Sequence, residues 1–182
     1  NIEMTRIAMG LDQVTSRDFN YEPTLSATEI EENLATVRNV RLLDPAVMRD
    51  TFQQTQGIKS FYDFRDIDVD RYTIDGRTTQ VVVAARELKQ TDLPNSSWES
   101  QHIAFTHGYG LAAAPANAID ANGRPAYALA DIPTNTRDGA DALAVSSPGL
   151  YVGEGLKGYA IVGATRDEVD FQDDDDRTEV TR

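Results

Sequence analysis

Cysteine is absent from the 182 residues, and histidine and tryptophan are scarce. Without thiols the chain has no disulfide bond, cysteine nucleophile or zinc-thiolate centre. Imidazole groups for acid-base catalysis or metal binding are limited to His102 and His107. Reducing and oxidising compartments both tolerate cysteine-free domains, so this absence does not assign a compartment.

Long hydrophobic runs are also absent. The sequence has no stretch of about eighteen apolar residues, the length that spans a bilayer, and it does not start with a charged and then apolar leader. The first residue is Asn1 rather than Met. We therefore expect an excised segment or a processed product of a longer protein.

Basic residues are few. Lys and Arg total 17 against 30 Asp and Glu, which gives a formal net charge of -13. A field of this sign repels nucleic acids and anionic membrane surfaces, so polyanions are not expected as partners. Hydrophobic residues make up 40% of the chain, as in ordinary soluble globular proteins, and the length is enough to bury a core.

The strongest structural signal lies in residues 61–88. Asp75-Gly76 separates two β-branched runs, and this pair predicts a β-hairpin because both central residues of a type I′ turn need positive φ. The first arm alternates apolar residues with aspartates, which indicates a strand with one solvated face near a sheet edge. The second arm is apolar on both faces at 81–85, which indicates a strand inside the sheet.

Helices are predicted before the hairpin. Ser26 and Glu29 have the spacing of a capping box, which begins a helix at about 27–36. A second helix begins with Asp44 as N-cap and Pro45 in the first turn, where the missing N–H is harmless. A short helix candidate also covers the first eleven residues.

Strands and irregular segments follow the hairpin. Residues 103–111 indicate a strand that passes into a tight segment permitted by glycine, and 112–148 are interpreted as long surface excursions with a short strand candidate at 127–132. The last strand candidates are 151–152 and 159–162. Because helices come early and strands late, we predict an α+β fold: a mixed or antiparallel sheet centred on the hairpin, with two or three short helices packed on one side.

Charge dominates the chain from residue 167 onward. The acidic run 173–176 is typical of a solvated or disordered segment. We therefore predict one soluble α+β domain at 1–166 and an acidic, flexible tail at 167–182.

A glycine-rich segment at 153–158 matches the dinucleotide-binding pattern G-x-G-x-x-G. A site of that kind needs a following helix whose N-terminus holds the pyrophosphate. Residues 159–162 continue as β-type sequence instead. We interpret the segment as a connection between strands and predict no cofactor.

Three aspartates, Asp66, Asp68 and Asp70, begin like a calcium-binding loop. Arg71 replaces the glycine that the sharp turn of such a loop requires, and Arg77 stands where its bidentate glutamate belongs. The favoured interpretation is a solvated strand face without a metal. Calcium or magnesium bound by the three aspartates is the alternative.

The two histidines lie five residues apart in a strand-like segment, on opposite faces, so they are not expected to share a metal. Structural histidines are favoured, and a general base is the alternative, since imidazole titrates near neutral pH. The catalytic candidates are His107, Asp63, Asp66, Asp68 and Asp70. The motifs of serine hydrolases, zinc proteases and P-loop proteins are not found in the sequence.

Aromatic residues concentrate around 98–109. The candidates for a ligand or partner surface are Trp98, His102, His107 and Tyr109. The competing interpretation packs Trp98, Phe105 and Tyr109 against the hairpin and the helix at Asp44, because aromatic rings supply much of a small core's buried area.

Successive blocks of the chain carry a resemblance to a known family. They are Asn1-Ile2, Thr5-Arg6, Gly10-Leu11-Asp12, Asn39-Val40-Arg41-Leu42-Leu43-Asp44-Pro45, Tyr62-Asp63-Phe64, Asp68-Val69-Asp70-Arg71-Tyr72-Thr73-Ile74-Asp75-Gly76, Ala85-Arg86-Glu87-Leu88 and Thr106-His107-Gly108-Tyr109-Gly110. In this order they resemble uncharacterised protein family 0182 (UPF0182). The resemblance extends to about Phe171 and does not include the acidic run after it.

The resemblance implies an excised extracytoplasmic domain of a bacterial, often actinobacterial, integral membrane protein with several amino-terminal membrane spans. It implies no activity, because none is assigned to the family. Our leading hypothesis is a non-enzymatic cell-envelope module, soluble when isolated, that binds the membrane-spanning part of its parent protein, an envelope protein or a ligand, and that also self-associates.

The alternative hypothesis is an envelope hydrolase that uses the clustered carboxylates and His107. A deep pocket that unites these side chains would favour the hydrolase. A splayed and solvated row of aspartates would favour the interaction module.

Overall fold

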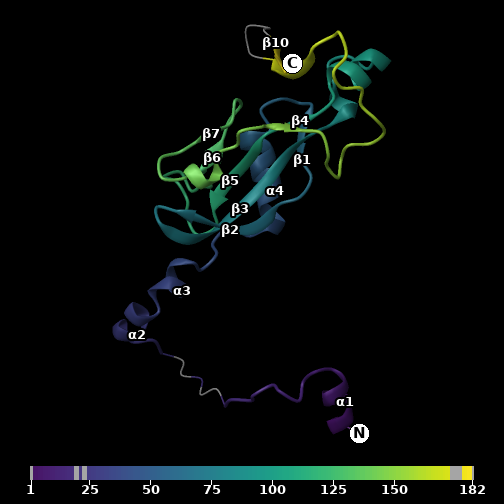
Figure 1. The fold of residues 1–182 in the computed structure, drawn as a ribbon. Helices are drawn as coiled ribbons and strands as arrows, with labels where there is room; N and C mark the ends of the chain where they lie inside the picture. The colour runs from purple at the N-terminus through teal and green to yellow at the C-terminus, as the bar shows by residue number, and fades with distance from the viewer. Residues whose placement is uncertain (1, 19–20, 22–23, 173–177, 182) are drawn as a thin grey trace. The chain divides into compact units, whose positions relative to one another are not determined.

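The computed structural model describes residues 2–18, 21, 24–172 and 178–181. The chain forms two compact units, residues 1–37 and residues 38–182, whereas the sequence analysis treats 1–166 as one domain. Helices come first and strands later, and the α+β fold predicted from the sequence is confirmed (Figure 1). Among the described residues, no helix is long and apolar enough to cross a membrane.

The first unit is a succession of short helices. They are α1 (Ile2–Ala8), α2 (Ala27–Glu32) and the greater part of α3 (Leu34–Arg38). The predicted capping box is present, because the Ser26 hydroxyl accepts a hydrogen bond from the Glu29 amide and the Glu29 carboxylate accepts one from the Ser26 amide. The helix predicted at 27–36 is divided at Asn33, whose side chain donates to the Glu29 carbonyl at 2.8 Å and so ends α2.

The second unit is built on an antiparallel sheet. Its strands are β1 (Tyr62–Phe64), β2 (Asp68–Ile74), β3 (Arg77–Leu88), β5 (Leu111–Pro115), β6 (Leu129–Ala130) and β7 (Asn135–Thr136), in the order β1-β3-β5-β6-β7 with β2 also paired to β3. The predicted hairpin is confirmed, with φ of 50° at Asp75 and 71° at Gly76. As expected, β3 is interior to the sheet and β2 lies at its edge.

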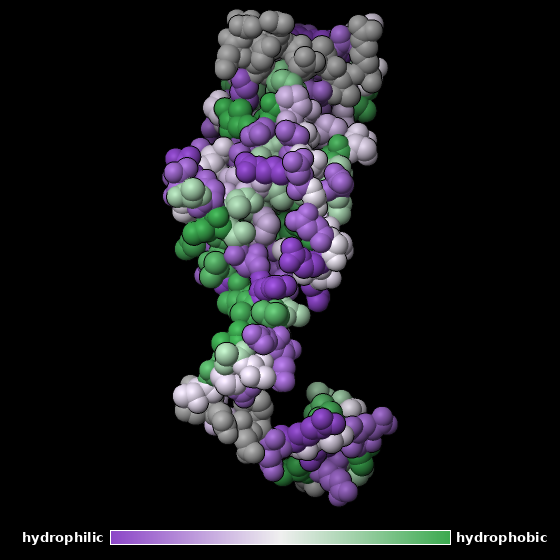
Figure 2. All heavy atoms as spheres, turned by 90° about the vertical axis from the view of Figure 1, so that its left-hand side faces the viewer, coloured by the Kyte–Doolittle hydropathy of each residue, from purple (hydrophilic) through white to green (hydrophobic). Residues whose placement is uncertain are grey.

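Both faces of β3 are covered. On one face, helix α4 (Pro45–Gln56) packs Phe52 against Phe64 and Tyr127, and Val82 belongs to the same cluster. On the other face Val81 joins residues of β5, β6 and the 3₁₀ turn η3 (Asp141–Leu143). Figure 1 shows α4 against the strands, and Figure 2 shows hydrophilic and hydrophobic residues mixed over the surface of this unit.

One prediction fails at β5. Residues 112–148 were expected to be surface excursions, but Ala112, Ala113 and Ala114 are fully buried in an interior strand. Alanine has a weak hydrophobic signal in a sequence, yet its small side chain lets both layers approach the sheet closely. The short strand candidate at 127–132 corresponds to β6.

Other predicted strands are also wrong. His102 lies in η2 (Ser100–Ala104), one turn of π-helix closed by the Phe105 amide on the Ser100 carbonyl at 2.9 Å. Residues 151–162 form no strand, and β8 (Gly149–Leu150), which pairs with β4 (Gly108–Tyr109), ends before them. Their β-branched residues find no ladder partner, and Val152 is 90% exposed.

The C-terminal segment contains a second hairpin. Strand β9 (Glu168–Gln172) pairs with β10 (Thr178–Thr181), and β9 lies in the segment that the sequence analysis assigned to a tail. Its Val169 and Phe171 are buried beside Phe61 and other residues near the start of β1. The acidic run 173–176 lies outside the described residues.

A 3₁₀ turn, η1 (Gln90–Asp92), follows β3.

Candidate functional site

Three rings form a cluster at the surface of the second unit. The rings of His102 and Tyr159 are stacked, with centroids 4.4 Å apart and planes 9° from parallel, and the Trp98 ring lies 5.3 Å from that of His102. Trp98 is 54% exposed and Tyr159 is 58% exposed. The cluster therefore presents aromatic surface to solvent.

Hydrogen bonds hold these rings in place. Trp98 Nε1 donates to the Tyr159 hydroxyl at 3.3 Å, and His102 Nδ1 lies 2.8 Å from the Tyr159 carbonyl. The Ile161 amide donates to the His102 carbonyl at 2.7 Å. The polar edges are thus engaged within the chain while ring surface remains exposed, so the rings have little side-chain entropy left to lose.

The neighbourhood of the ring cluster is both apolar and charged. Val162 is 57% exposed, and Ile161 is 39% exposed. Glu99, next to Trp98, forms an ion pair with Arg166. Trp, Tyr and Arg are the residues most enriched in the energetically dominant parts of protein interfaces.

His107 lies in a separate, buried polar network. Its Nε2 is 2.9 Å from Asp170 Oδ1, its Nδ1 is 3.2 Å from the Thr106 hydroxyl, and its ring stacks on Tyr151 with centroids 4.7 Å apart. The Thr106 and Tyr151 hydroxyls both donate to Glu168, and the Tyr62 hydroxyl donates to the Asp170 carbonyl. The network attaches β9 to the body of the unit.

Burial sets the electrostatics of this network. It lowers the pKa of His107, and the nearby carboxylates of Asp170 and Glu168 oppose that shift. Burial, together with Glu168, raises the pKa of Tyr151 to about 12. His107 is only 1% exposed, and its ring connects β9 to the body of the unit through Asp170.

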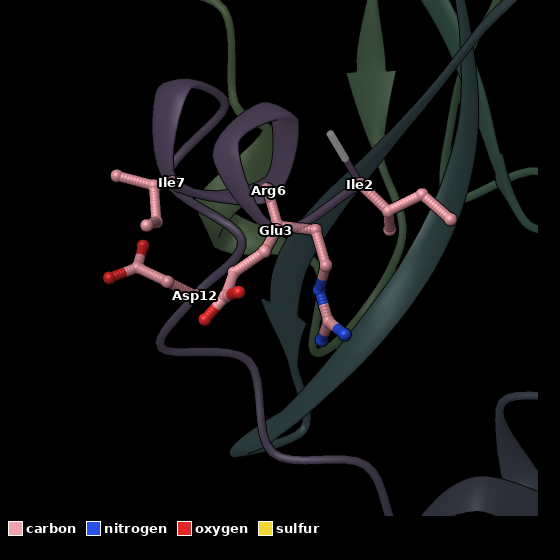
Figure 3. Close-up of a pocket in the computed structure, with 5 residues that line it drawn as sticks. All are labelled: Ile2, Glu3, Arg6, Ile7 and Asp12. Atoms are coloured by element: carbon pink, nitrogen blue, oxygen red, sulfur yellow. The ribbon is translucent and has the colours of Figure 1, made fainter.

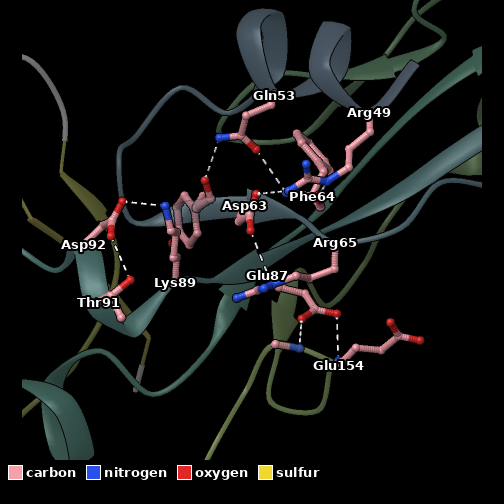
Figure 4. Close-up of polar contacts among 12 residues, drawn as sticks. Arg49, Gln53, Asp63, Phe64, Arg65, Glu87, Lys89, Thr91, Asp92 and Glu154 are labelled. Atoms are coloured by element: carbon pink, nitrogen blue, oxygen red, sulfur yellow. Dashed lines mark hydrogen bonds and ion pairs between the residues drawn. The ribbon is translucent and has the colours of Figure 1, made fainter. Parts of the chain in front are cut away.

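The acidic catalytic candidates are not assembled around His107. Asp63 is buried and accepts from Arg49 and Arg65, each at 3.3 Å (Figure 4). Asp66, Asp68 and Asp70 are exposed, and Asp66 and Asp70 each accept the amide of the next residue in the chain. Across the described ranges, no three His, Asp or Glu side chains form a group that would hold a metal ion.

The glycine-rich segment encloses a carboxylate of its own chain. Glu87 is buried, and its two carboxylate oxygens accept the amides of Glu154 at 2.9 Å and Gly155 at 2.5 Å (Figure 4). A Cβ at Gly153 would lie 2.5 Å from Glu87 Cδ. Amides that would contact a phosphate in a nucleotide site therefore bind Glu87 here.

The four proposed surface residues fall in two places. Trp98 and His102 lie together at the surface, whereas His107 and Tyr109 are interior, and the Tyr109 ring packs edge-on against Phe171 at 5.4 Å. Sequence reasoning missed Tyr159 because it is 57 residues from His102 and its segment was interpreted as a strand. It missed Asp170 and Glu168 because their segment was interpreted as a tail.

A hollow lies on the surface of the first unit. Its volume is about 570 Å³, and its lining residues are Ile2, Glu3, Arg6, Ile7 and Asp12. Figure 3 shows the two isoleucines on opposite sides of the charged Glu3 and Arg6. All five residues are exposed, so the hollow is an open surface of α1 and the residues after it.

Comparison with known proteins identifies a family. Residues 1–181 match the family model described as "Uncharacterised protein family (UPF0182)". A UPF0182 protein of Moorella thermoacetica is 43% identical over 173 residues, which are 94% of this chain and 19% of the relative. UPF0182 proteins of Geobacter sulfurreducens and Methanospirillum hungatei are 39% and 36% identical, over 94% and 97% of this chain.

The chain spans about a fifth of the length of these curated relatives. No solved structure matches it. Because the match extends over nearly every residue, the resemblance seen in the sequence blocks is confirmed: this chain belongs to the uncharacterised protein family UPF0182.

Proposed function

We propose that this chain is a non-enzymatic interaction domain of a longer membrane protein, placed on the extracytoplasmic side of a bacterial cell membrane. Its ring cluster, Trp98, His102 and Tyr159, is the proposed contact surface. The partner is the membrane-spanning part of the same protein or another protein of the envelope. A second copy of the chain is a further partner that the cross-linking below would capture through the same surface.

The exposure of the ring cluster is the observation that carries the proposal. Two large aromatic side chains are each more than half exposed although their polar atoms are held by hydrogen bonds within the chain. His102 lies on a turn of π-helix, a rare conformation that occurs frequently at functional sites. A rigid aromatic surface of this kind is typical of binding rather than of chemistry on a substrate.

The arrangement of the acidic residues disfavours the hydrolase. The three exposed aspartates lie on or beside the edge strand β2, Asp63 is neutralised by two arginines, and His107 is buried with Asp170. Among the described residues, every buried side-chain nitrogen and oxygen has a hydrogen-bond partner. Asp63 and His107 thus have separate partners, and the other three carboxylates are exposed, an arrangement that does not support a shared reaction centre.

That the chain is one part of a longer protein is supported by the length of the relatives. They are about five times as long as this chain, so the domain is one part of a larger protein in that family. The membrane spans of that protein lie, in this proposal, outside residues 1–182.

Photo-cross-linking in the intact protein tests the proposal. A photoreactive amino acid replaces Trp98 or Tyr159 in cells, and the products are mapped by mass spectrometry. We expect adducts with the membrane region or with an envelope protein. As the control, the same amino acid at Ile119, a residue of the same unit that is 53% exposed, should give a different set of adducts.

Substitution then measures the energy of the contact. Trp98→Ala should weaken binding of the captured partner about thirtyfold, the effect of losing an interface residue that contributes about 2 kcal/mol. The melting temperature should stay close to that of the parent chain, because the ring is exposed. Unchanged binding, or a small envelope ligand recovered near His107 instead of a protein adduct, would remove support for the interaction domain.

A further inference from the structure

The first unit carries many large apolar side chains but has no core. Not one of its described residues is buried. Eleven large apolar side chains are exposed: Ile2, Met4, Ile7, Met9, Leu11, Val14, Tyr21, Leu25, Ile30, Leu34 and Val37. Figure 2 shows hydrophobic residues at the surface of this unit beside hydrophilic ones. Exposed apolar residues at this density mark an interaction surface.

The apolar residues of α1 follow the helical period. Met4 and Ile7 are three residues apart in α1, so they form a short stripe on one face of the helix, and Leu11 follows the positive φ of Gly10 after the helix ends. Met4 is 67% exposed and Ile7 is 51% exposed. Arg6 and Glu3 supply charge beside this stripe.

A second stripe runs along α2 and α3. Leu34 and Val37 are three residues apart in α3, and Ile30 lies in α2 before the division at Asn33. Leu25 precedes the N-cap of α2 at the position from which a hydrophobic staple contacts the residue at Ile30. These side chains are 36–74% exposed. Glu32 faces away from the stripe.

Helices this short need tertiary contacts. Each has seven residues or fewer, and isolated helices below about twelve to fifteen residues are marginal in water. Helical stability in proteins comes mainly from packing an amphipathic face against a partner. The short helices of residues 1–37 therefore need an apolar surface to pack against.

We propose that residues 1–37 are a docking arm whose two apolar stripes bind an apolar surface, flanked by basic residues, in the part of the parent polypeptide outside residues 1–182. The inference rests on the proposed function, because it requires the chain to be part of a longer protein. The arm belongs to the family itself, since the family match begins at residue 1.

The length of the relatives favours an occupant in the same polypeptide. About four fifths of each relative lies outside the matched region. A surface tethered to the arm is present at an effective concentration in the millimolar range, far above that of a separate protein.

Charge argues against the other occupants. Residues 1–37 contain seven acidic and two basic side chains, and the whole chain has a net charge of -13. Like charges oppose pairing with a second copy. Helices that lie on membranes have polar faces rich in Lys and Arg, whereas most charged residues of 1–37 are acidic. An acidic arm is complementary in charge to an apolar surface that is flanked by basic residues.

Hydrogen exchange tests whether the arm needs the rest of the protein. Amides of α1, α2 and α3 are compared between the isolated 182-residue chain and the intact parent protein. We expect exchange in the intact protein to be at least tenfold slower. Equal exchange in the two samples overturns the proposal, whichever rate they share.

Cross-linking identifies the occupant. A photoreactive residue at Ile7 or Leu34 should join the arm to residues of the same polypeptide outside 1–182, and the matched control at Glu32, on the polar face, should not. Isotope-mixed protein distinguishes a second copy from the same chain. Adducts confined to residues 38–182, to a second copy or to lipid overturn the proposal.

A pair of substitutions separates the apolar contact from the helix itself. Leu34→Ser should restore fast exchange in the intact protein, while Glu32→Ser should not, because only the first removes an apolar contact. Identical effects of the two substitutions overturn the proposal. The two proposals can fail separately. If the Trp98 experiments give no partner but the arm experiments give the expected results, the ring cluster is refuted as a contact surface and the docking arm is retained.

Discussion

At the scale of single residues, the unusual feature is a buried carboxylate enclosed by backbone amides. Glu87 lies in β3 with 6% of its surface exposed, and it accepts the amides of Glu154 and Gly155. Hydrogen bonds to a charged group contribute more than neutral ones, and removal of the acceptor leaves both donors unsatisfied. The irregular segment 151–162 is therefore expected to depend on this one side chain.

Glu87→Ala should lower the free energy of unfolding by about 1–3 kcal/mol, since the partly buried amides of Glu154 and Gly155 lose a charged acceptor. Urea unfolding gives the value. The matched control is Glu154→Ala, which removes an exposed side chain, keeps its backbone amide and should change stability by less than about 0.5 kcal/mol. Glu87→Gln retains one acceptor of the same size and should lie between them. Equal stability of the Glu87→Ala and Glu154→Ala variants would contradict this role.

At the scale of elements, the hairpin β2–β3 is the feature that local sequence specifies most directly. Both turn residues have positive φ, and a Cβ built at Gly76 meets no atom within 4 Å. A side chain at this position would therefore cost conformational energy without any steric clash. A substitution at Gly76 therefore measures backbone strain without a contribution from steric clash.

Gly76→Val should destabilise the chain by about 1–2 kcal/mol, because a β-branched residue resists the left-handed region. Thermal melts measure the change. Gly76→Asn is the matched control, since asparagine adopts positive φ more readily, and Thr78→Ser is a neutral change at an exposed position near the start of β3. A melting temperature for Gly76→Val equal to that of both controls would argue against the turn.

At the scale of the whole molecule, the attachment of β9 couples stability to pH through His107. Burial lowers the pKa of His107 below its ordinary value of 6.5, so the folded chain binds this proton more weakly than the unfolded chain. As the pH falls below about 6.5, the unfolded chain takes up the proton first. The stabilising contribution is present above that pH and is lost as the pH falls through the folded pKa.

His107→Gln should flatten the dependence of melting temperature on pH between about 5 and 7, the range in which histidine titrates. The comparison is between slopes, because the substitution also lowers stability at every pH. Thr78→Ser, which leaves both histidines in place, should keep the parent slope. A His107→Gln variant with the parent slope would show that another group controls this range.

Features that depend on neighbours in the sequence were predictable. The hairpin turn, the capping box at Ser26 and the Asp44 cap all appear as expected, because each is decided by φ preferences or by hydrogen bonds over a few residues. The interior position of β3 followed from its two apolar faces. The family match likewise lay in the order of sequence blocks.

The candidate site was decided by tertiary structure. Tyr159 reaches His102 across 57 residues, and Glu87 reaches Glu154 across 67. Neither pairing leaves a local pattern, since the groups that satisfy a side chain are chosen by how distant segments pack. For the same reason the alanines of β5 were misassigned, because their burial comes from the layers above and below the strand. Local chemistry determined the turns and caps of this chain, and packing alone decided which aromatic and acidic groups face solvent.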